Sequence, residues 1–218
     1  MTGPSPHYAL VFDFDGVVLD SATLKRQAFA DLYTDAPESQ YRAVCAYLGR
    51  KGGQPREVKF RHIEAHILGR PANEERIREL CARFKSSVEQ RLLHAPAIPG
   101  ALEFLSRWAT ERPLYLLSAT PEAELRGIVA QRGLAHFFQE VVGSPPDKVT
   151  GLRNLMARWG YAANETVMIG DSYNDYRAAR SNGTRFVGVT ADPEVSPFPD
   201  ETITVRDLHG LEAALAQL

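Results

Sequence analysis

Two carboxylates follow an apolar run near the start of the chain: Asp13 and Asp15 come directly after residues 9–12. Such a run predicts a buried strand, where Asp is rare and costly to bury. Two carboxylates at a strand end can divide the work of phosphoryl transfer, one as oxygen nucleophile and the other as proton donor and acceptor. Gly16 then allows a turn. The alternative is that Asp13 caps a turn and Asp15 is a solvated loop residue, because Asp-x-Asp-Gly also occurs in turns and calcium loops.

A hydroxyl-bearing segment follows a second apolar run. Residues 114–117 lead into Ser118, Ala119 and Thr120, and Pro121 is expected to open a helix. A hydroxyl and the free N–H groups of a helix N-terminus can donate to phosphate oxygens, and the helix dipole favours negative charge there. The segment therefore indicates a phosphate-binding turn. The alternative is that Thr120 caps the helix and Ser118 only fills the turn.

Lys148 follows the next predicted strand and is the only lysine after Lys85. An ammonium is a compact charge that can bridge a phosphate and a carboxylate without the planar geometry of a guanidinium. The alternative is an ordinary solvated lysine in the first turn of a helix.

Asp171 and Asp175 follow another apolar run, at residues 167–169. Mg²⁺ prefers hard oxygen ligands and commonly takes one or two carboxylates together with phosphate oxygens and water. Asp13 and Asp171 can supply that pair, although Asp171 can also be explained as a helix cap. Four acids gathered in one pocket would repel one another and their pKa values would rise. Mg²⁺ and Lys148 would offset this repulsion.

The stretches between these residues alternate between strand and helix patterns, which favours an α/β class with a doubly wound, mostly parallel, Rossmann-like sheet. Ligands of such sheets bind beyond the carboxyl ends of the strands, where the polar residues above lie. Residues 22–92 interrupt the alternation as a long helical insertion. The expected further strands are 114–117, 140–142, 166–169, 186–189 and 203–205, and the expected helices are 22–33, 38–48, 56–68, 74–92, 101–109, 121–132, 149–159, 173–181 and 208–218.

The 218 residues are enough for one α/β core and a modest insertion, and with 44% hydrophobic residues neither disorder nor a fibrous class is indicated. Cys45 and Cys81 fall within helical patterns, where we expect both to be buried apolar residues. Two such cysteines argue against a disulfide framework or zinc cluster and fit a reducing compartment. Neither a signal pattern nor an apolar run of the roughly 20 residues that span a bilayer is evident, so we expect a cytoplasmic protein without membrane partners.

The net charge of −2 is unevenly distributed, because residues 16–95 hold 14 Lys and Arg against 10 Asp and Glu. The excess of basic over acidic residues comes from residues 50–61. A short basic cluster fits a small anionic ligand better than a nucleic acid, which needs a broader basic stripe. His62 and His66, four residues apart, are more simply explained by an exposed helix face than by a metal site. The basic residues are Arg50, Lys51, Arg56, Lys59 and Arg61, and the alternative for Arg50, Lys51 and Arg61 is a solvent-facing helix end.

Taken in order, the segment from Asp13 to Gly16, then Ser118, Lys148 and the segment from Gly170 to Asp175 resemble the four motifs of the haloacid dehalogenase superfamily. The resemblance covers the whole chain. It implies that Asp13 attacks phosphorus and becomes an aspartyl-phosphate. Asp15 would protonate the leaving oxygen and later activate the hydrolytic water. Asp15 also favours a phosphate ester, because members that cleave carbon–halogen or phosphonate bonds lack this second acid.

The same resemblance implies the remaining site residues. Ser118 and Lys148 would hold phosphoryl oxygens, and Gly16 and Ala119 would contact the substrate. Mg²⁺ would bind Asp13, Asp171 and the main-chain carbonyl of Asp15, with Asp175 supporting the metal or Lys148.

The helical insertion is similar to the small cap of the branch that includes phosphoglycolate phosphatase and beta-phosphoglucomutase. This implies a catalytic core of residues 1–15 and 96–218 and a helical cap of residues 16–95. Arg56, Lys59 and Lys51 are the expected anion contacts of the cap. The spacing from Gly53 to Arg56 resembles the loop by which the mutase holds its sugar phosphate.

The sequence therefore predicts a magnesium-dependent phosphatase that hydrolyses a small phosphorylated metabolite and is a monomer or weak homodimer. The alternative is a phosphosugar mutase, in which the phosphoryl group returns to a sugar hydroxyl. A third hypothesis, a non-catalytic binding protein on the same scaffold, is disfavoured by the intact set of acids.

Overall fold

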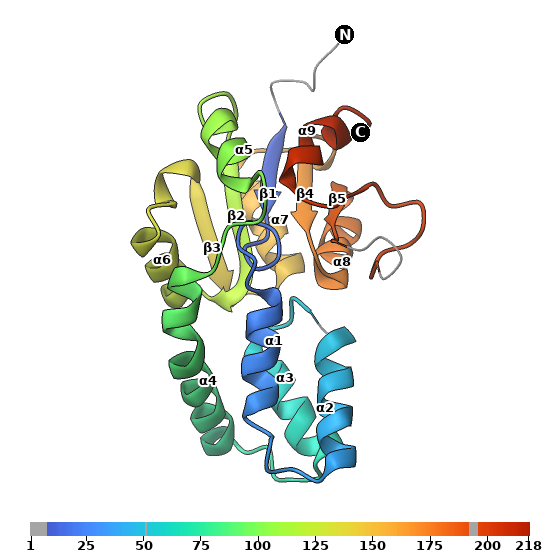
Figure 1. Cartoon of the computed structure of the whole chain (residues 1–218). Coiled ribbons are helices and arrows are strands. Elements are labelled where there is room, and N and C mark those ends of the chain that lie inside the picture. Colours follow the sequence, from blue (N-terminus) through green and yellow to red (C-terminus); the bar gives the residue numbers. More distant parts are fainter. Residues whose placement is uncertain (1–7, 51, 192–195) are drawn as a thin grey trace.

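The computed structural model describes residues 8–50, 52–191 and 196–218, which form a sheet-containing layer and a helical layer (Figure 1). Within these residues, six strands form one sheet in the order β3-β2-β1-β4-β5-β6. Every strand pairing is parallel, as the sequence predicts. The strands are β1 (Ala9–Phe12), β2 (Leu114–Pro121), β3 (Glu140–Ser144), β4 (Thr166–Gly170), β5 (Arg185–Val189) and β6 (Thr204–Val205).

Helices cover both faces of the sheet. Alternate side chains of β1 point to opposite faces, so Leu10 and Phe12 join one apolar cluster while Ala9 and Val11 join the other. The second cluster is completed by α7 and α8, and the first by α5, α6 and α9. This arrangement is the doubly wound fold. The helices are α5 (Ala101–Trp108), α6 (Glu122–Gln131), α7 (Lys148–Trp159), α8 (Tyr173–Asn182) and α9 (Leu211–Leu215).

The helical layer follows β1 in the sequence and lies beyond the carboxyl ends of the strands (Figure 1). Its helices pack around three aromatic rings: the ring centre of Phe29 lies 4.9 Å from that of Phe60 and 4.1 Å from that of Phe84. These residues belong to the same apolar cluster as Phe12 of β1, so the core is continuous between the layers. The helices are α1 (Ala22–Asp31), α2 (Glu38–Arg50), α3 (Arg56–His62), with a π-helical continuation at Ile63–Ile67, and α4 (Glu74–His94).

Three local predictions from the sequence are wrong. The second strand does not stop at Leu117 but continues to Pro121, so α6 begins one residue later than expected. The expected final helix at 208–218 is a short 3₁₀ turn followed by α9. Cys45 is exposed and Cys81 is partly exposed, because the helices of the thin helical layer keep one face in water. Among the described residues, no helix combines the length and the apolarity that a membrane span requires.

The order of the strands places the ligand crevice. From β1 the chain moves outward to β2 and β3, and then returns to the other side of β1 with β4. At such a reversal the connections leave on opposite faces and open a crevice between the neighbouring strand ends. Asp13 follows β1 and Asp171 follows β4, so both carboxylates lie at this point.

Candidate active site

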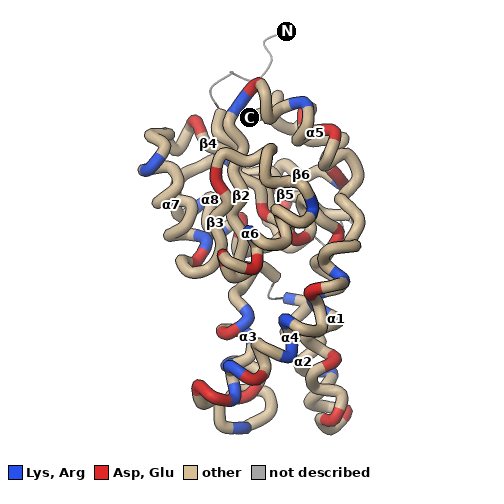
Figure 2. The backbone as a smooth tube through the Cα atoms, turned by 90° about the vertical axis from the view of Figure 1, so that its left-hand side faces the viewer, with Lys and Arg blue, Asp and Glu red and all other residues tan. Residues whose placement is uncertain are grey.

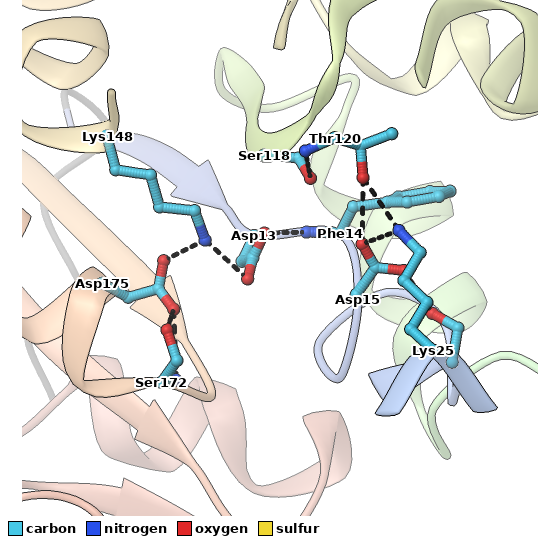
Figure 3. Close-up of polar contacts among 10 residues, drawn as sticks. Asp13, Phe14, Asp15, Lys25, Ser118, Thr120, Lys148, Ser172 and Asp175 are labelled. Atoms are coloured by element: carbon cyan, nitrogen blue, oxygen red, sulfur yellow. Dashed lines mark hydrogen bonds and ion pairs between the residues drawn. The ribbon is translucent and has the colours of Figure 1, made fainter. Parts of the chain in front are cut away.

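Asp13 is the first residue after β1 and is only 3% exposed. Its Oδ1 accepts a hydrogen bond of 2.7 Å from the backbone N–H of Phe14, and its Oδ2 lies 2.7 Å from Nζ of Lys148 (Figure 3). Burial raises the pKa of Asp13 to about 7, with Asp175 and Asp15 adding to the rise, although Lys148 acts in the opposite direction. The backbone N–H of Phe14 and the ammonium of Lys148 therefore hold the desolvated carboxylate of Asp13 at the end of β1.

Lys148 is the first residue of α7, after the helix cap Asp147, and its side chain is buried. Its Nζ bridges Oδ2 of Asp13 and Oδ1 of Asp175, the latter at 2.5 Å. Burial lowers the pKa of Lys148, but the two carboxylates outweigh this and raise it above its ordinary value. The solvated-lysine alternative is therefore wrong, and Lys148 remains an ammonium between two acids.

Asp175 lies in the first turn of α8 and is fully buried. Its Oδ2 accepts hydrogen bonds from the backbone N–H and the hydroxyl of Ser172, at 3.1 and 2.6 Å, while Oδ1 faces Lys148. The helix cap is Ser172 and not Asp171, so the alternative role considered for Asp171 is wrong. Asp175 is thus fixed by Ser172 through one oxygen and can hold the ammonium of Lys148 in place through the other.

Asp171 makes no hydrogen bond or ion pair with any residue that the structure describes. It lies against Gly16, whose φ is +84° and where a Cβ atom would lie 2.2 Å from Oδ2 of Asp171. Only glycine fits that contact and that backbone angle. Burial, followed by repulsion from Asp13 and Asp175, raises the pKa of Asp171 well above its ordinary value.

The acids provide a donor set that fits a divalent cation. One oxygen from each of Asp13, Asp171 and Asp175 lies within 4.8 Å of the other two. Hard oxygen ligands suit Mg²⁺, and a cation would relieve the repulsion that raises the pKa values of Asp13 and Asp171. Asp13 and Asp171 line the cavity described below, whereas Asp175 does not, and both of its oxygens are engaged by Lys148 and Ser172. Asp13 and Asp171 are therefore the side chains best placed to hold the ion.

The carboxylate of Asp15 is not part of this acidic cluster and turns to the other side of the site (Figure 3). Its Oδ2 lies 2.6 Å from Nζ of Lys25 and its Oδ1 accepts a hydrogen bond of 2.6 Å from Ser21. Thr120 donates to Asp15 at 3.3 Å and accepts from Lys25 at 2.8 Å. Burial acts to raise the pKa of Asp15, but Lys25 and Ser21 outweigh it and hold the pKa below the ordinary value.

Lys25 and Thr120 are site residues that the sequence analysis missed. Ser21 and Lys25 are four residues apart at the start of α1 and therefore share one helix face. This spacing is the feature of the sequence that could have predicted that both face Asp15. Thr120 had been considered as a helix cap, but the cap of α6 is Pro121 and no side chain closes it. Thr120 lies inside β2, which the sequence had predicted to end earlier.

Ser118 lies within β2 and not in a turn, and its side chain is 2% exposed. Its hydroxyl oxygen accepts a hydrogen bond of 3.1 Å from the backbone N–H of Thr120, which leaves the O–H proton free for an acceptor in the site. Ser118 and Ala119 both line the cavity described next.

A cavity of about 500 Å³ lies between the two layers beside the shared apolar core, and both layers contribute to its wall. Gly52 and Gly53 of the helical layer meet the loop before α8: a Cβ on Gly53, whose φ is +67°, would lie 2.3 Å from Oγ of Ser172. The volume is in the range of small-molecule sites. Wall residues that the sequence singled out are Asp13, Asp15, Gly16, Arg50, Gly53, Arg56, Lys59, Ser118, Ala119, Lys148 and Asp171.

The expected anion contacts of the helical layer have different surroundings. Arg56 is buried and forms an ion pair with Glu124 of α6, with 2.5 Å between Nη2 and Oε2. Sequence reasoning did not anticipate this partner, which lies 68 residues away. Lys59 is also buried but has no carboxylate in contact among the described residues, and Lys51 lies outside the described residues.

Comparisons with known proteins identify the family of the chain. A family profile described as haloacid dehalogenase-like hydrolase matches residues 8–183. A curated phosphoglycolate phosphatase from Rhodospirillum rubrum is 30% identical over 208 residues, which covers 86% of this chain and 83% of the relative.

Solved structures share the fold at lower identity. One described as a predicted phosphoglycolate phosphatase from Haemophilus somnus has a TM-score of 0.76 at 19% identity and covers 95% of this chain and 97% of its own. The HAD-hydrolase YfnB from Bacillus subtilis, solved with bound magnesium and described as revealing interdomain movement, has a TM-score of 0.70 at 19% identity, with coverage of 96% and 98%. At these identities the likeness establishes the fold alone.

Proposed function

The chain belongs to the haloacid dehalogenase-like hydrolase family, and from that premise we propose that it is a magnesium-dependent phosphatase that hydrolyses small phosphate monoesters through an aspartyl-phosphate. The phosphatase class is supported by the curated relatives. One observation supports the mechanism most directly. Asp13 and Asp15 are two residues apart but have opposite environments, Asp13 beside Lys148 and the other acids, Asp15 beside Lys25.

In the first half of the proposed reaction, a carboxylate oxygen of Asp13 attacks phosphorus. A bond forms between that oxygen and phosphorus, and the bond from phosphorus to the ester oxygen breaks. Lys25 keeps Asp15 ionised in the substrate-free site, so Asp15 must first take up a proton when the negative charge of the substrate raises its pKa. It then passes that proton to the departing oxygen, and the product leaves as an alcohol. Lys148 and the hydroxyl of Ser118 donate to phosphoryl oxygens, and Gly16 and Ala119 allow the substrate to approach the backbone.

In the second half, water attacks phosphorus, Asp15 takes a proton from the water, and the bond to Asp13 breaks to release phosphate. The ammonium of Lys25 stabilises the ionised form of Asp15 that this step requires. Bound Mg²⁺, held by Asp13, Asp171 and the main-chain carbonyl of Asp15, would neutralise charge on the phosphoryl oxygens. Asp175 holds the ammonium of Lys148 in position through its ion pair.

We further propose that residues 16–95 act as a cap over a catalytic core formed by residues 1–15 and 96–218; residues 1–7, 51 and 192–195 of these ranges lie outside the described part. Arg56 and Glu124 join the two across the cavity, as do Gly53 and Ser172. The interdomain movement of the Bacillus structure supports a cap that opens for exchange. A cytoplasmic location and a monomeric or weakly dimeric state remain predictions.

Hydrolysis is favoured over the mutase alternative. That alternative depended on Arg56 as a contact for a sugar phosphate, and the ion pair with Glu124 occupies this guanidinium. The test is a panel of phosphorylated metabolites with Mg²⁺, in which both phosphate release and isomer formation are measured. We expect phosphate release, and we expect Asp13→Asn to abolish it while Lys85→Met, an exposed control on α4, retains it. Isomer formation without release, or full activity of Asp13→Asn, would contradict the proposal.

A further inference from the structure

The wall of the cavity contains a buried ammonium without a carboxylate partner. Lys59 of α3 is 8% exposed and lines the cavity. Its Nζ lies 4.9 Å from the ring centre of Phe29, and it makes no hydrogen bond or ion pair within the described ranges 8–50, 52–191 and 196–218. A ring face compensates an ammonium only in part.

The other largely buried cations of this wall are all paired, which makes Lys59 the exception among the residues described. Each pair has a distance of 2.5 to 2.7 Å. The pairs are Lys148 with Asp13 and Asp175, Lys25 with Asp15, and Arg56 with Glu124.

An unpaired buried charge is costly, and a ligand that supplied the missing partner would offset that cost. Burial, with repulsion from Lys25, lowers the pKa of Lys59 to about 8. The ammonium form therefore still predominates at neutral pH. Figure 2 shows that several basic positions of the helical layer lie where that layer approaches the sheet.

The position of Lys59 indicates which part of a substrate it meets. The phosphoryl group is assigned to Asp13, Ser118 and Lys148, all on the sheet-containing layer. Lys59 lies on α3 in the opposite layer, so it faces whatever the phosphoryl group is attached to. Arg56, one turn earlier on the same helix, is excluded from this role by Glu124.

We propose that Lys59 binds a second anionic group on the leaving alcohol, so that the preferred substrates are phosphate monoesters of small alcohols that carry a carboxylate or a second phosphate. This inference rests on the proposed phosphatase function. The cavity of about 500 Å³ limits the alcohol to a small one. Both anions share the chemistry that an ammonium recognises, an oxyanion with several acceptor lone pairs.

The test compares three esters that differ at the second carbon of the alcohol: ethyl phosphate with a methyl group, glycolate phosphate with a carboxylate, and 1,2-ethanediol bisphosphate with a second phosphate. The enzyme is assayed with Mg²⁺ as wild type, Lys59→Met and Lys59→Arg, with Lys85→Met as the matched control. We expect the wild type to prefer one of the two anionic esters over ethyl phosphate. The one preferred identifies the anion as carboxylate or phosphate.

Lys59→Met should reduce that preference, expressed as a ratio of kcat/KM values, by about 10- to 100-fold, mainly through KM, because a charge-assisted hydrogen bond is lost. Lys59→Arg should restore part of it, and Lys85→Met should leave the ratio unchanged. An equal loss on all three esters, or an unchanged ratio, would overturn the role of Lys59. Absence of turnover on any ester by the wild type would instead overturn the phosphatase function, and the inference with it.

Discussion

Nζ of Lys25 lies 2.6 Å from Oδ2 of Asp15, so the first helix of the helical layer touches the acid that is proposed to move protons. The contact links two segments that are ten residues apart and is shared with Thr120 of β2. Asp13, two residues before Asp15, is instead paired with Lys148 on the other side of the site (Figure 3). Two similar carboxylates are thus given different electrostatic surroundings, as division of labour between nucleophile and proton carrier requires.

Lys25→Met should move the acidic limb of the pH profile of kcat to higher pH, because hydrolysis of the aspartyl-phosphate needs Asp15 in its ionised form. Burial raises the pKa of Asp15 and Lys25 counteracts it, so removing Lys25 leaves the raising influence alone. Lys25→Arg, which keeps the charge, should shift the limb less. An unchanged limb in Lys25→Met would show that Asp15 does not control it.

The same pair should also contribute to stability in a pH-dependent way. The folded pKa of Asp15 is lowered, so its contribution is present above the unfolded value of 3.8 and is lost as the pH falls through the folded pKa. Urea unfolding of wild type and Lys25→Met should therefore differ at pH 7 and converge in strong acid. A difference that grows in acid would contradict the assignment.

Mg²⁺ should stabilise the protein and release protons on binding. Burial raises the pKa of Asp13 to about 7 and also raises the pKa of Asp171, and a carboxyl group that binds a metal must give up its proton. The gain at 100 times Kd is about 2.7 kcal/mol, or roughly 5–10 °C in Tm, and should be larger at pH 8 than at pH 6. Thermal melts with Mg²⁺ and with EDTA measure it. Asp171→Asn should remove most of the shift; a full shift in that variant would place the metal elsewhere.

Glu124→Gln should destabilise the protein by about 2 kcal/mol, because it leaves the buried guanidinium of Arg56 without its partner. The double variant Arg56→Met with Glu124→Leu should recover much of this loss, since neither charge remains. With the single variants Arg56→Met and Glu124→Leu, urea unfolding completes a double-mutant cycle, which separates the coupling energy of the pair from the effect of each substitution. Equal stability of Glu124→Gln and wild type would mean that the pair contributes nothing.

Lys59→Met should stabilise the substrate-free protein by about 1–3 kcal/mol at pH 7, because it removes an unpaired buried charge. The sign follows from a folded pKa of about 8 against 10.5 in the unfolded chain. The cost is fully present below pH 8 and declines as the pH rises toward 10.5, so the gain of the variant should decline over the same interval. The charges near Lys59 are Lys25, Asp15, Asp171 and Lys148. A variant less stable than wild type would indicate a structural role for Lys59.

The sequence alone determined the class of fold and predicted which polar residues gather at one site. Strand and helix periodicities are local, so the parallel sheet and the helical insertion could be predicted from them. Asp13, Asp15, Ser118, Lys148 and Asp171 could be selected because polar residues at the ends of buried strands must converge at one edge of the sheet. Local patterns were less reliable at ends of elements, as the continuation of β2 through Ser118 and Thr120 shows.

Only the tertiary structure decided which charges are paired. Lys25 with Thr120, and Arg56 with Glu124, join residues 95 and 68 positions apart, and no local pattern encodes such distances. The sequence ranked Arg56 and Lys59 together as anion contacts, but the fold neutralises Arg56 and leaves Lys59 unpaired. The physical reason is that the energy of a buried charge depends on its nearest neighbours in space, and these are set when the two layers pack against each other.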